Sequence, residues 1–146
     1  YQLVHKCKVC ALYVYHKGHE EHKDFMDYTN QVIGAAIKVH MELGPGLLES
    51  CYQKCLFWEC LDSGLVVEKE KRIPIEYKGR TIKDAFRIDL LVESKLVIEI
   101  KSVSELSAIH EAQVLTYLKL CKIRVGLLIN FNEYKLKYGI KRLVLD

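Results

Sequence analysis

The sequence predicts an α/β domain with a mixed central sheet flanked by helices. Three observations lead to this fold class. Apolar residues recur at helical spacing early in the chain, alternating and wholly apolar runs typical of strands follow, and a helical pattern returns between two later strands. Such an order is typical of a sheet whose faces are covered by helices. The 146 residues, half of them hydrophobic, suffice for one domain with a real core.

The expected helices end at recognisable stop signals. Gly44-Pro45-Gly46 separates the first helix from the second, and Ser63-Gly64 ends the second. The third helix carries apolar residues on nearly every side, which predicts that it is well buried. The helices are expected at residues 28–43, 47–62 and 106–121.

The strand patterns indicate both edge and interior positions in the sheet. The run 123–131 is apolar almost throughout, as expected inside a sheet, whereas the tail 140–145 suits an edge strand. Lys78-Gly79 between two strand patterns predicts a hairpin turn. The strands are expected at residues 65–69, 73–77, 81–92, 96–101, 123–131 and 140–145.

Strand alternation gives two consecutive strands one apolar face each and gathers their charges opposite it. Asp89 lies on the charged face of the first strand, and Glu99 and Lys101 lie on that of the second. The residues expected on the apolar face of the first strand are Phe86, Ile88, Leu90 and Val92.

The short connection 93–95 predicts that these two strands form an antiparallel hairpin. The apolar faces coincide only if Val92 lies opposite Leu96, and counting back from this pair places Asp89 opposite Glu99. Their Cβ atoms would then be roughly 4.5–5.5 Å apart, and two facing carboxylates repel each other. A divalent cation such as Mg²⁺ or Mn²⁺ would offset the repulsion.

Lys101 lies two residues beyond Glu99 on the same face, where its ammonium could hold and polarise a water beside the metal. A bound metal lowers the pKa of water and stabilises charge on a phosphate oxygen. Asp89, Glu99 and Lys101 therefore form a minimal phosphodiester-cleaving site. The structural alternative is a solvated sheet face with a casual Glu–Lys pair.

Several separated motifs resemble the PD-(D/E)XK nucleases. Asp89, followed ten residues later by Glu99-Ile100-Lys101, is similar to their D…(D/E)-x-K signature. Gly46-Leu47-Leu48-Glu49-Ser50-Cys51-Tyr52 resembles the signature of GxxExxY proteins, a branch of that superfamily. The match runs roughly from Met26 to the C-terminus. Further motifs in the expected order lie at residues 43–46, 89–93, 110–113 and 126–131.

The resemblance implies a restriction-endonuclease-like αβββαβ core and a Mg²⁺-dependent nuclease acting on DNA or RNA. It also implies that Asp89 and Glu99 ligate the metal, that Lys101 orients a water, and that Glu49 is a further metal-binding acid from the preceding helix. Glu49 in a first helical turn could instead complement the helix dipole. The alternative function is a catalytically inactive nuclease-fold protein in nucleic-acid binding or oligomeric assembly.

Gln113 and Tyr117 resemble the Q-x-x-x-Y feature of RecB-like nucleases and share one face of their helix. Gln113 is therefore a candidate catalytic residue, and Tyr117 is a candidate contact to nucleic acid. His110, at the start of the same helix, could touch a phosphate. Each has a structural alternative: a backbone hydrogen bond for Gln113, core packing for Tyr117, and no role beyond the helix start for His110.

Residues 1–25 match nothing in the family, and they are separated here from a nuclease-like domain at 26–146. This segment contains Cys-x₂-Cys, half of a zinc site, and histidines that could complete it. The spacing matches no known zinc module, and an extra strand or hairpin or a partner-binding arm is favoured over Zn²⁺. The candidate ligands are Cys7, Cys10, His16, His19 and His22.

Bulk properties permit these functions without selecting among them. A net charge of +3 and a pI of about 8.5 allow binding to nucleic acid. No apolar run approaches the roughly 18 residues of a membrane helix, and no signal peptide is visible, so a cytoplasmic protein with reduced cysteines is expected. A homo-oligomer is compatible with the sequence.

Overall fold

The computed structural model describes residues 21–146, and the side chains of residues 28–146. This part of the chain forms a mixed sheet, as predicted, and the sheet has five strands. Three α-helices and one short 3-10 helix accompany it. The elements are α1 (Glu21–Leu43), α2 (Glu49–Asp62), β1 (Val67–Tyr77), β2 (Arg80–Val92), β3 (Leu96–Lys101), α3 (Ala108–Cys121), β4 (Val125–Asn130), η1 (Leu136–Gly139) and β5 (Ile140–Val144).

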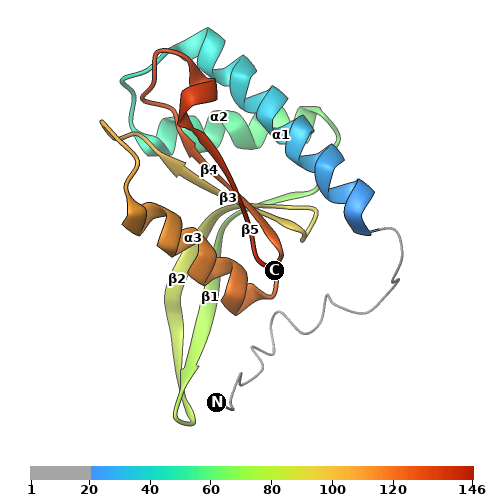
Figure 1. Ribbon diagram of the computed structural model, residues 1–146, viewed down its shortest axis with the longest axis vertical. Helices are drawn as coiled ribbons and strands as arrows, with labels where there is room; N and C mark the ends of the chain where they lie inside the picture. Colours follow the sequence, from blue (N-terminus) through green and yellow to red (C-terminus); the bar gives the residue numbers. More distant parts are fainter. Residues whose placement is uncertain (1–20) are drawn as a thin grey trace.

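The strands follow one another across the sheet in chain order, β1-β2-β3-β4-β5. The β3–β4 pair is parallel because α3 connects these two strands, and the other neighbouring pairs are antiparallel. Helices α1 and α2 lie on one face of the sheet and α3 lies on the other (Figure 1). The predicted edge strand at the C-terminus is confirmed as β5, which pairs with β4.

The sheet separates two hydrophobic cores. The larger joins the inner sides of α1 and α2 to alternate residues of β3 and β4, with Val32, Leu56, Ile98 and Leu127 fully buried within it. The smaller lies beneath α3 and contains Val97 and Leu128 from the intervening strand positions. This alternation along β3 and β4 is what period-two strands require when both sheet faces are covered.

Two element predictions are corrected by the structure. Residues 67–69 of the first predicted strand and residues 73–77 of the second belong to one strand, β1, because the charged stretch between them still pairs with β2. Helix α3 is not buried on nearly every side. It packs on the sheet through one face only, and Ile109 on its outer side is 72% exposed because no element covers that side in the described chain.

Two predicted connections between strands are confirmed, and for one of them the predicted register as well. Lys78 and Gly79 form a two-residue turn between Tyr77 and Arg80, and both have positive φ, as a type I′ turn requires. The loop 93–95 brings Val92 opposite Leu96. The second pairing fixes which residues of β2 and β3 meet at the candidate site.

No helix in the described part of the chain is long and apolar enough to cross a membrane. Two of the cysteines within residues 28–146, Cys60 and Cys121, are buried in the cores. Burial is the main cause that raises the pKa of the Cys60 thiol to about 12, so this cysteine serves as a small apolar core residue.

Gly126 on β4 lies where α3 approaches the sheet, and a Cβ built there would be 2.8 Å from Val114 Cγ1. We expect Gly126→Ala to lower the free energy of unfolding by about 1–3 kcal/mol, because the packed α3 must shift. Gly34→Ala on α1 is the control. A Cβ at Gly34 meets nothing within 4 Å, so this substitution should stabilise by about 0.5–1 kcal/mol. Urea unfolding of both variants measures the difference, and equal effects would contradict the close approach of α3.

Candidate active site

The loop between α1 and α2 positions Glu49 at the end of β3. Gly44 and Gly46 adopt positive φ, and the buried Tyr52 fastens the loop: its hydroxyl donates to Gly44 O and accepts from Leu47 N at 3.1 Å. The Tyr52 ring also stacks on Phe131, with centroids 4.5 Å apart. Tyr52 is therefore a structural residue that fixes the loop and packs in the larger core.

Helix α2 starts at Glu49 beside Ser102, the residue that follows β3. Ser102 Oγ donates to Leu47 O at 2.6 Å, and Ser102 N donates to Glu49 Oε1 at 3.4 Å. The Glu49 side chain remains exposed. The three positions of the G-x-x-E-x-x-Y pattern thus have distinct local roles. Gly46 forms the turn, Glu49 points to the end of β3, and Tyr52 holds the loop in place.

The β2–β3 ladder opens at the candidate acids. Regular pairing ends at Leu90 opposite Ile98, one pair before Asp89 would meet Glu99. Carboxylate oxygens take over there as hydrogen-bond acceptors. Ile100 N donates to Asp89 Oδ2 at 2.8 Å, and Asp89 N donates to Glu99 Oε1 at 3.3 Å. The two carboxyl groups are also joined by a side-chain hydrogen bond. The structure therefore brings the two predicted acids together.

The face assignment of β2 is corrected at the same place. Leu90 and Val92 belong to the core beneath α1 and α2, but Ile88 belongs to the core beneath α3. Strict alternation would put all three on one face. The strand therefore changes face across Asp89, opposite Glu70, whose φ of 51° distorts β1. The distortion turns Asp89 toward β3 instead of outward from the sheet.

Burial and like charge oppose the ionisation of this pair. Glu99 is 4% exposed, and burial first, then the negative charge of Asp89, raises the pKa of Glu99 to about 8. Burial also raises the pKa of Asp89, with a smaller contribution from Glu49, although the Ile100 N–H and Lys101 act against it. The ammonium of Lys101 therefore lies close enough to favour the charged form of both acids.

Helix α3 contributes the predicted Gln113 and Tyr117 to the edge of this cluster. Gln113 Nε2 donates to Tyr117 Oη at 2.8 Å, and the Tyr117 ring stacks on Phe86 of β2 with centroids 4.3 Å apart. Burial raises the pKa of Tyr117, and the negative charge of Glu99 adds to the effect. Tyr117 therefore packs in the smaller core with its hydroxyl near the acids.

His110 takes part in the start of α3. Its Nδ1 accepts a hydrogen bond from Ser107 N at 3.1 Å, which completes a capping box at the N-terminus of this helix. The ring is thus used locally, and a contact with phosphate would involve its other nitrogen. The role of His110 in nucleic-acid binding stays a prediction.

Sequence reasoning missed three polar residues that support the site. Gln53 Nε2 donates to Asp89 O at 3.1 Å, and Ser102 ties β3 to α2 as described above. The fully buried Asn130 holds the chain after β3, because its amide group exchanges hydrogen bonds with Val103 N and Val103 O. A polar residue closing the apolar run of β4 was the signal for Asn130, whereas Gln53 gave no signal in sequence.

No group of three or more His, Cys, Asp or Glu side chains within residues 28–146 is arranged to hold a metal ion. Asp89 and Glu99 form a pair, and Glu49 approaches it without joining it. The predicted metal role of these three acids therefore stays a prediction. The residues predicted as possible Zn²⁺ ligands lie outside the described side chains: Cys7, Cys10, His16, His19 and His22.

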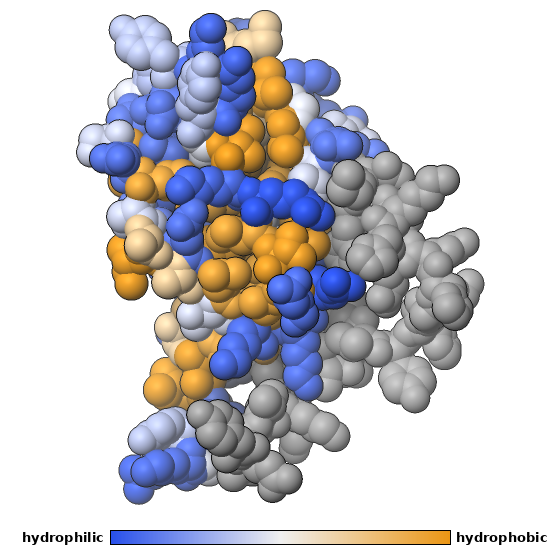
Figure 2. Space-filling model, in the orientation of Figure 1, coloured by the Kyte–Doolittle hydropathy of each residue, from blue (hydrophilic) through white to orange (hydrophobic). Residues whose placement is uncertain are grey.

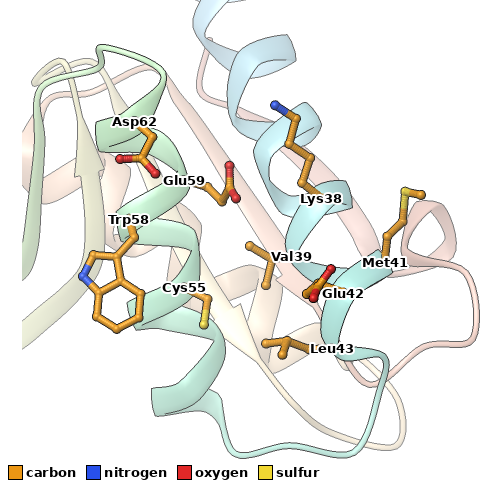
Figure 3. A pocket seen from close by; sticks show the side chains of 9 residues that line it. All are labelled: Lys38, Val39, Met41, Glu42, Leu43, Cys55, Trp58, Glu59 and Asp62. Atoms are coloured by element: carbon orange, nitrogen blue, oxygen red, sulfur yellow. The ribbon is translucent and has the colours of Figure 1, made fainter.

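A separate hollow of about 550 Å³ lies between α1 and α2 (Figure 3). Met41, Leu43 and Trp58 give it apolar walls, and acidic side chains lie at its margin. None of the predicted site residues lines it, and the acids around it do not form a metal cluster. The hollow is therefore a surface feature of the helical layer and not part of the carboxylate site.

A mixed sheet with an Asp, a Glu and a Lys on two adjacent strands, flanked by an acid from α2 and a Gln–Tyr pair from α3, is the arrangement of a nuclease-type fold. The family model of the PD-(D/E)XK nuclease superfamily matches residues 26–143, and the chain belongs to this superfamily. The fold is accordingly restriction-endonuclease-like. No curated protein and no solved structure matches the chain.

The hydroxyl of Tyr52 can be removed without removing its ring. We expect Tyr52→Phe to lower the free energy of unfolding by roughly 1–2 kcal/mol, because Gly44 O and Leu47 N lose their partner while stacking on Phe131 persists. Urea unfolding measures this. Tyr134→Phe is the control, since Tyr134 is 96% exposed and should be neutral. Equal urea midpoints for both variants would show that the hydroxyl of Tyr52 does not stabilise the loop.

Glu99→Gln keeps the shape and the acceptor oxygen of Glu99 but removes one of the two like charges. In chelator, the folded wild-type chain keeps a proton on Glu99 up to about pH 8, whereas the unfolded chain releases it near pH 4.5. Wild-type stability should therefore fall as pH rises through this window. The variant should show a smaller fall, because only Asp89 then keeps a pKa raised by burial, and it should gain on the order of 1 kcal/mol at pH 8.5. Thermal unfolding at pH 5 and 8.5 tests this, and a stability difference that does not change with pH would refute it.

Proposed function

We propose that this protein is a Mg²⁺-dependent nuclease that hydrolyses phosphodiester bonds in nucleic acid, and that within its superfamily it is of the GxxExxY type. One observation carries the proposal: the carboxyl groups of Asp89 and Glu99 meet where the β2–β3 ladder opens, with the Lys101 ammonium beside them. Nucleases of this superfamily typically depend on divalent metal ions.

The donor set fits a hard divalent cation. Carboxylate oxygens are the ligands that Mg²⁺ and Mn²⁺ prefer, and burial opposes the joint ionisation of the pair even beside Lys101. Asp89 and Glu99 would hold the ion, and Glu49, already oriented toward the end of β3 by Ser102, would supply a further carboxylate. When bound, the cation would neutralise phosphate charge and make a water more acidic.

The remaining residues act around the scissile phosphate. Lys101 would hold the attacking water by a hydrogen bond and stabilise the charge that develops on the phosphate. Gln113 would orient that water or a phosphate oxygen once its side chain leaves Tyr117, and Tyr117 would contact the nucleic acid with its hydroxyl. Gln53 would keep Asp89 in place by holding its backbone carbonyl.

A second function has its own support. The carboxylate oxygens of Asp89 and Glu99 already accept backbone hydrogen bonds, and no third acid joins them within the described residues. A chain with this arrangement could use the nuclease fold to bind nucleic acid or to assemble oligomers without cleaving. This alternative requires binding that persists without metal and no metal-dependent cleavage.

Cleavage of single- and double-stranded DNA and RNA, with Mg²⁺, Mn²⁺ or chelator, tests the proposal. We expect metal-dependent cleavage that falls about 100-fold or more in Glu99→Ala and Lys101→Ala, because each removes charge that acts on the reacting phosphate or its metal. Lys38→Ala, at an exposed position on α1, is the matched control and should cleave like the wild type.

Equal cleavage by the wild type, Glu99→Ala and Lys101→Ala would show that the activity lies elsewhere. Absence of cleavage with every substrate, together with metal-independent binding, would favour the inactive nuclease-fold protein. Thermal unfolding with Mn²⁺ adds a readout that does not need activity. The metal should raise the melting temperature of the wild type and leave that of Glu99→Gln unchanged.

A further inference from the structure

Strands β1 and β2 continue beyond the body of the sheet as a two-stranded ribbon. Only residues 90–92 of β2 pair with β3, so residues 71–88 of the hairpin pair solely with each other. Figure 1 shows the hairpin extending past α3, with its turn as the outermost point. We call residues 71–87 the arm. An isolated ribbon is only marginally stable, and this one is anchored at its base by Ile73 and by Phe86 stacked on Tyr117.

The positive charge of the protein is concentrated on the arm. Residues 71–87 contain six Lys or Arg and two Asp or Glu, a net charge of +4, whereas the whole chain has +3. All other residues together are therefore slightly acidic. The basic residues of the arm are Lys71, Arg72, Lys78, Arg80, Lys83 and Arg87.

Charge pairing within the arm leaves much of this charge available. Arg72 lies directly opposite Arg87, an arrangement of like charges that destabilises a strand pair. Lys71 pairs with Glu68, just before the arm, at 2.7 Å, and Arg72 pairs with the exposed Asp84 at 3.6 Å. Arg80, Lys83 and Arg87 make no ion pair within the described residues. A polyanion bound along the arm would offset this repulsion.

The outer end of the arm combines basic and apolar side chains. Tyr77 and Ile82 are 62% and 55% exposed, and Lys78 and Arg80 flank the turn. Figure 2 shows hydrophilic side chains at the tip and hydrophobic ones immediately above it. Base edges in a groove offer both kinds of contact, since thymine methyl groups accept apolar side chains.

The dimensions of the arm suit B-form DNA. The major groove is about 12 Å wide and admits a two-stranded ribbon, whereas the major groove of A-form RNA is too narrow for side chains to read. From Asp89 to Arg80, the first residue of β2 after the turn, the strand spans roughly 30 Å at about 3.3 Å per residue. One helical turn of DNA is about 34 Å. The arm therefore reaches about one turn along a duplex whose phosphate lies at the carboxylates.

We propose that the arm binds double-stranded DNA in the major groove, with Arg72 and Arg87 holding backbone phosphates next to the Asp89–Glu99 pair. The arm leads directly into that pair, because Arg87 precedes Asp89 by two residues on β2. This inference rests on the proposed nuclease function for its link to cleavage, but the binding itself requires no metal and no catalysis.

Binding of labelled 20-base-pair DNA, the same length of double-stranded RNA, and single-stranded DNA is measured by fluorescence anisotropy in chelator, which prevents cleavage. The arm variant is Lys78→Gln/Arg80→Gln/Lys83→Gln, three exposed positions. The control, Lys38→Gln/Lys135→Gln/Lys137→Gln, removes three exposed charges from α1 and the η1 region, so that net charge is matched. Thermal unfolding verifies that both variants fold.

We expect the arm variant to bind duplex DNA at least about tenfold more weakly at 100 mM NaCl. Its slope of log Kd against log salt should fall by two to three, at about 0.9 per lost phosphate contact. The control should keep the wild-type slope. Equal losses in the two variants, an unchanged arm variant, or tighter binding of RNA duplex or single strands would each overturn the proposal.

Failure of the nuclease proposal gives a different pattern. Arm-dependent DNA binding without metal-dependent cleavage would support the arm and reject catalysis. Metal-dependent cleavage with DNA binding that does not depend on the arm would support catalysis and reject the role of the arm.

Discussion

The exchange of hydrogen bonds between β2 and β3 is the constraint on which the candidate site depends. Where the ladder would continue, Ile100 N–H turns to the carboxylate of Asp89, and Asp89 N–H turns to that of Glu99. Each backbone donor stays satisfied, as a buried amide must. Because side chains replace backbone carbonyls as acceptors, β2 can separate from β3 at Asp89. Strand β3 stays paired with β2 through Leu90–Val92 and with β4 along its whole length.

The same parting links the site to the shape of the hairpin. Beyond Asp89, β2 no longer follows β3 but leaves with β1 as the arm, and the change of face between Ile88 and Leu90 marks where it departs. Phe86 and Tyr117 then hold the base of the arm against α3. One local distortion thus separates the acids from the regular sheet and directs the basic ribbon outward beside them.

Contacts from the helical layer also hold the candidate acids in place. Tyr52 fixes the loop before α2, Ser102 joins that helix to the end of β3, and Gln53 reaches the carbonyl of Asp89. On the far side, Asn130 secures the chain after Lys101. The acids are therefore held from three elements, which reduces the conformational freedom that a catalytic group would otherwise lose on meeting its substrate.

The sequence by itself determined the element order, the mixed sheet, the Val92–Leu96 register and the meeting of Asp89 with Glu99. These follow from period-two and helical patterns and from loop length, which act over short distances along the chain. The length of β1 escaped prediction because its charged stretch lacks strand alternation, and the burial of α3 was overestimated because apolar composition does not tell which side finds a neighbour.

Only the tertiary structure decided how the acids meet. Strict alternation cannot foresee a strand that changes face, because the cause lies partly on the neighbouring strand, at Glu70. Strand alternation also cannot find Gln53 and Asn130, whose partners are distant in sequence. Nor can it predict that the β1–β2 hairpin extends beyond its pairing with β3. The extent of pairing between β2 and β3 is set by packing across the whole sheet, and no local pattern in the chain encodes it.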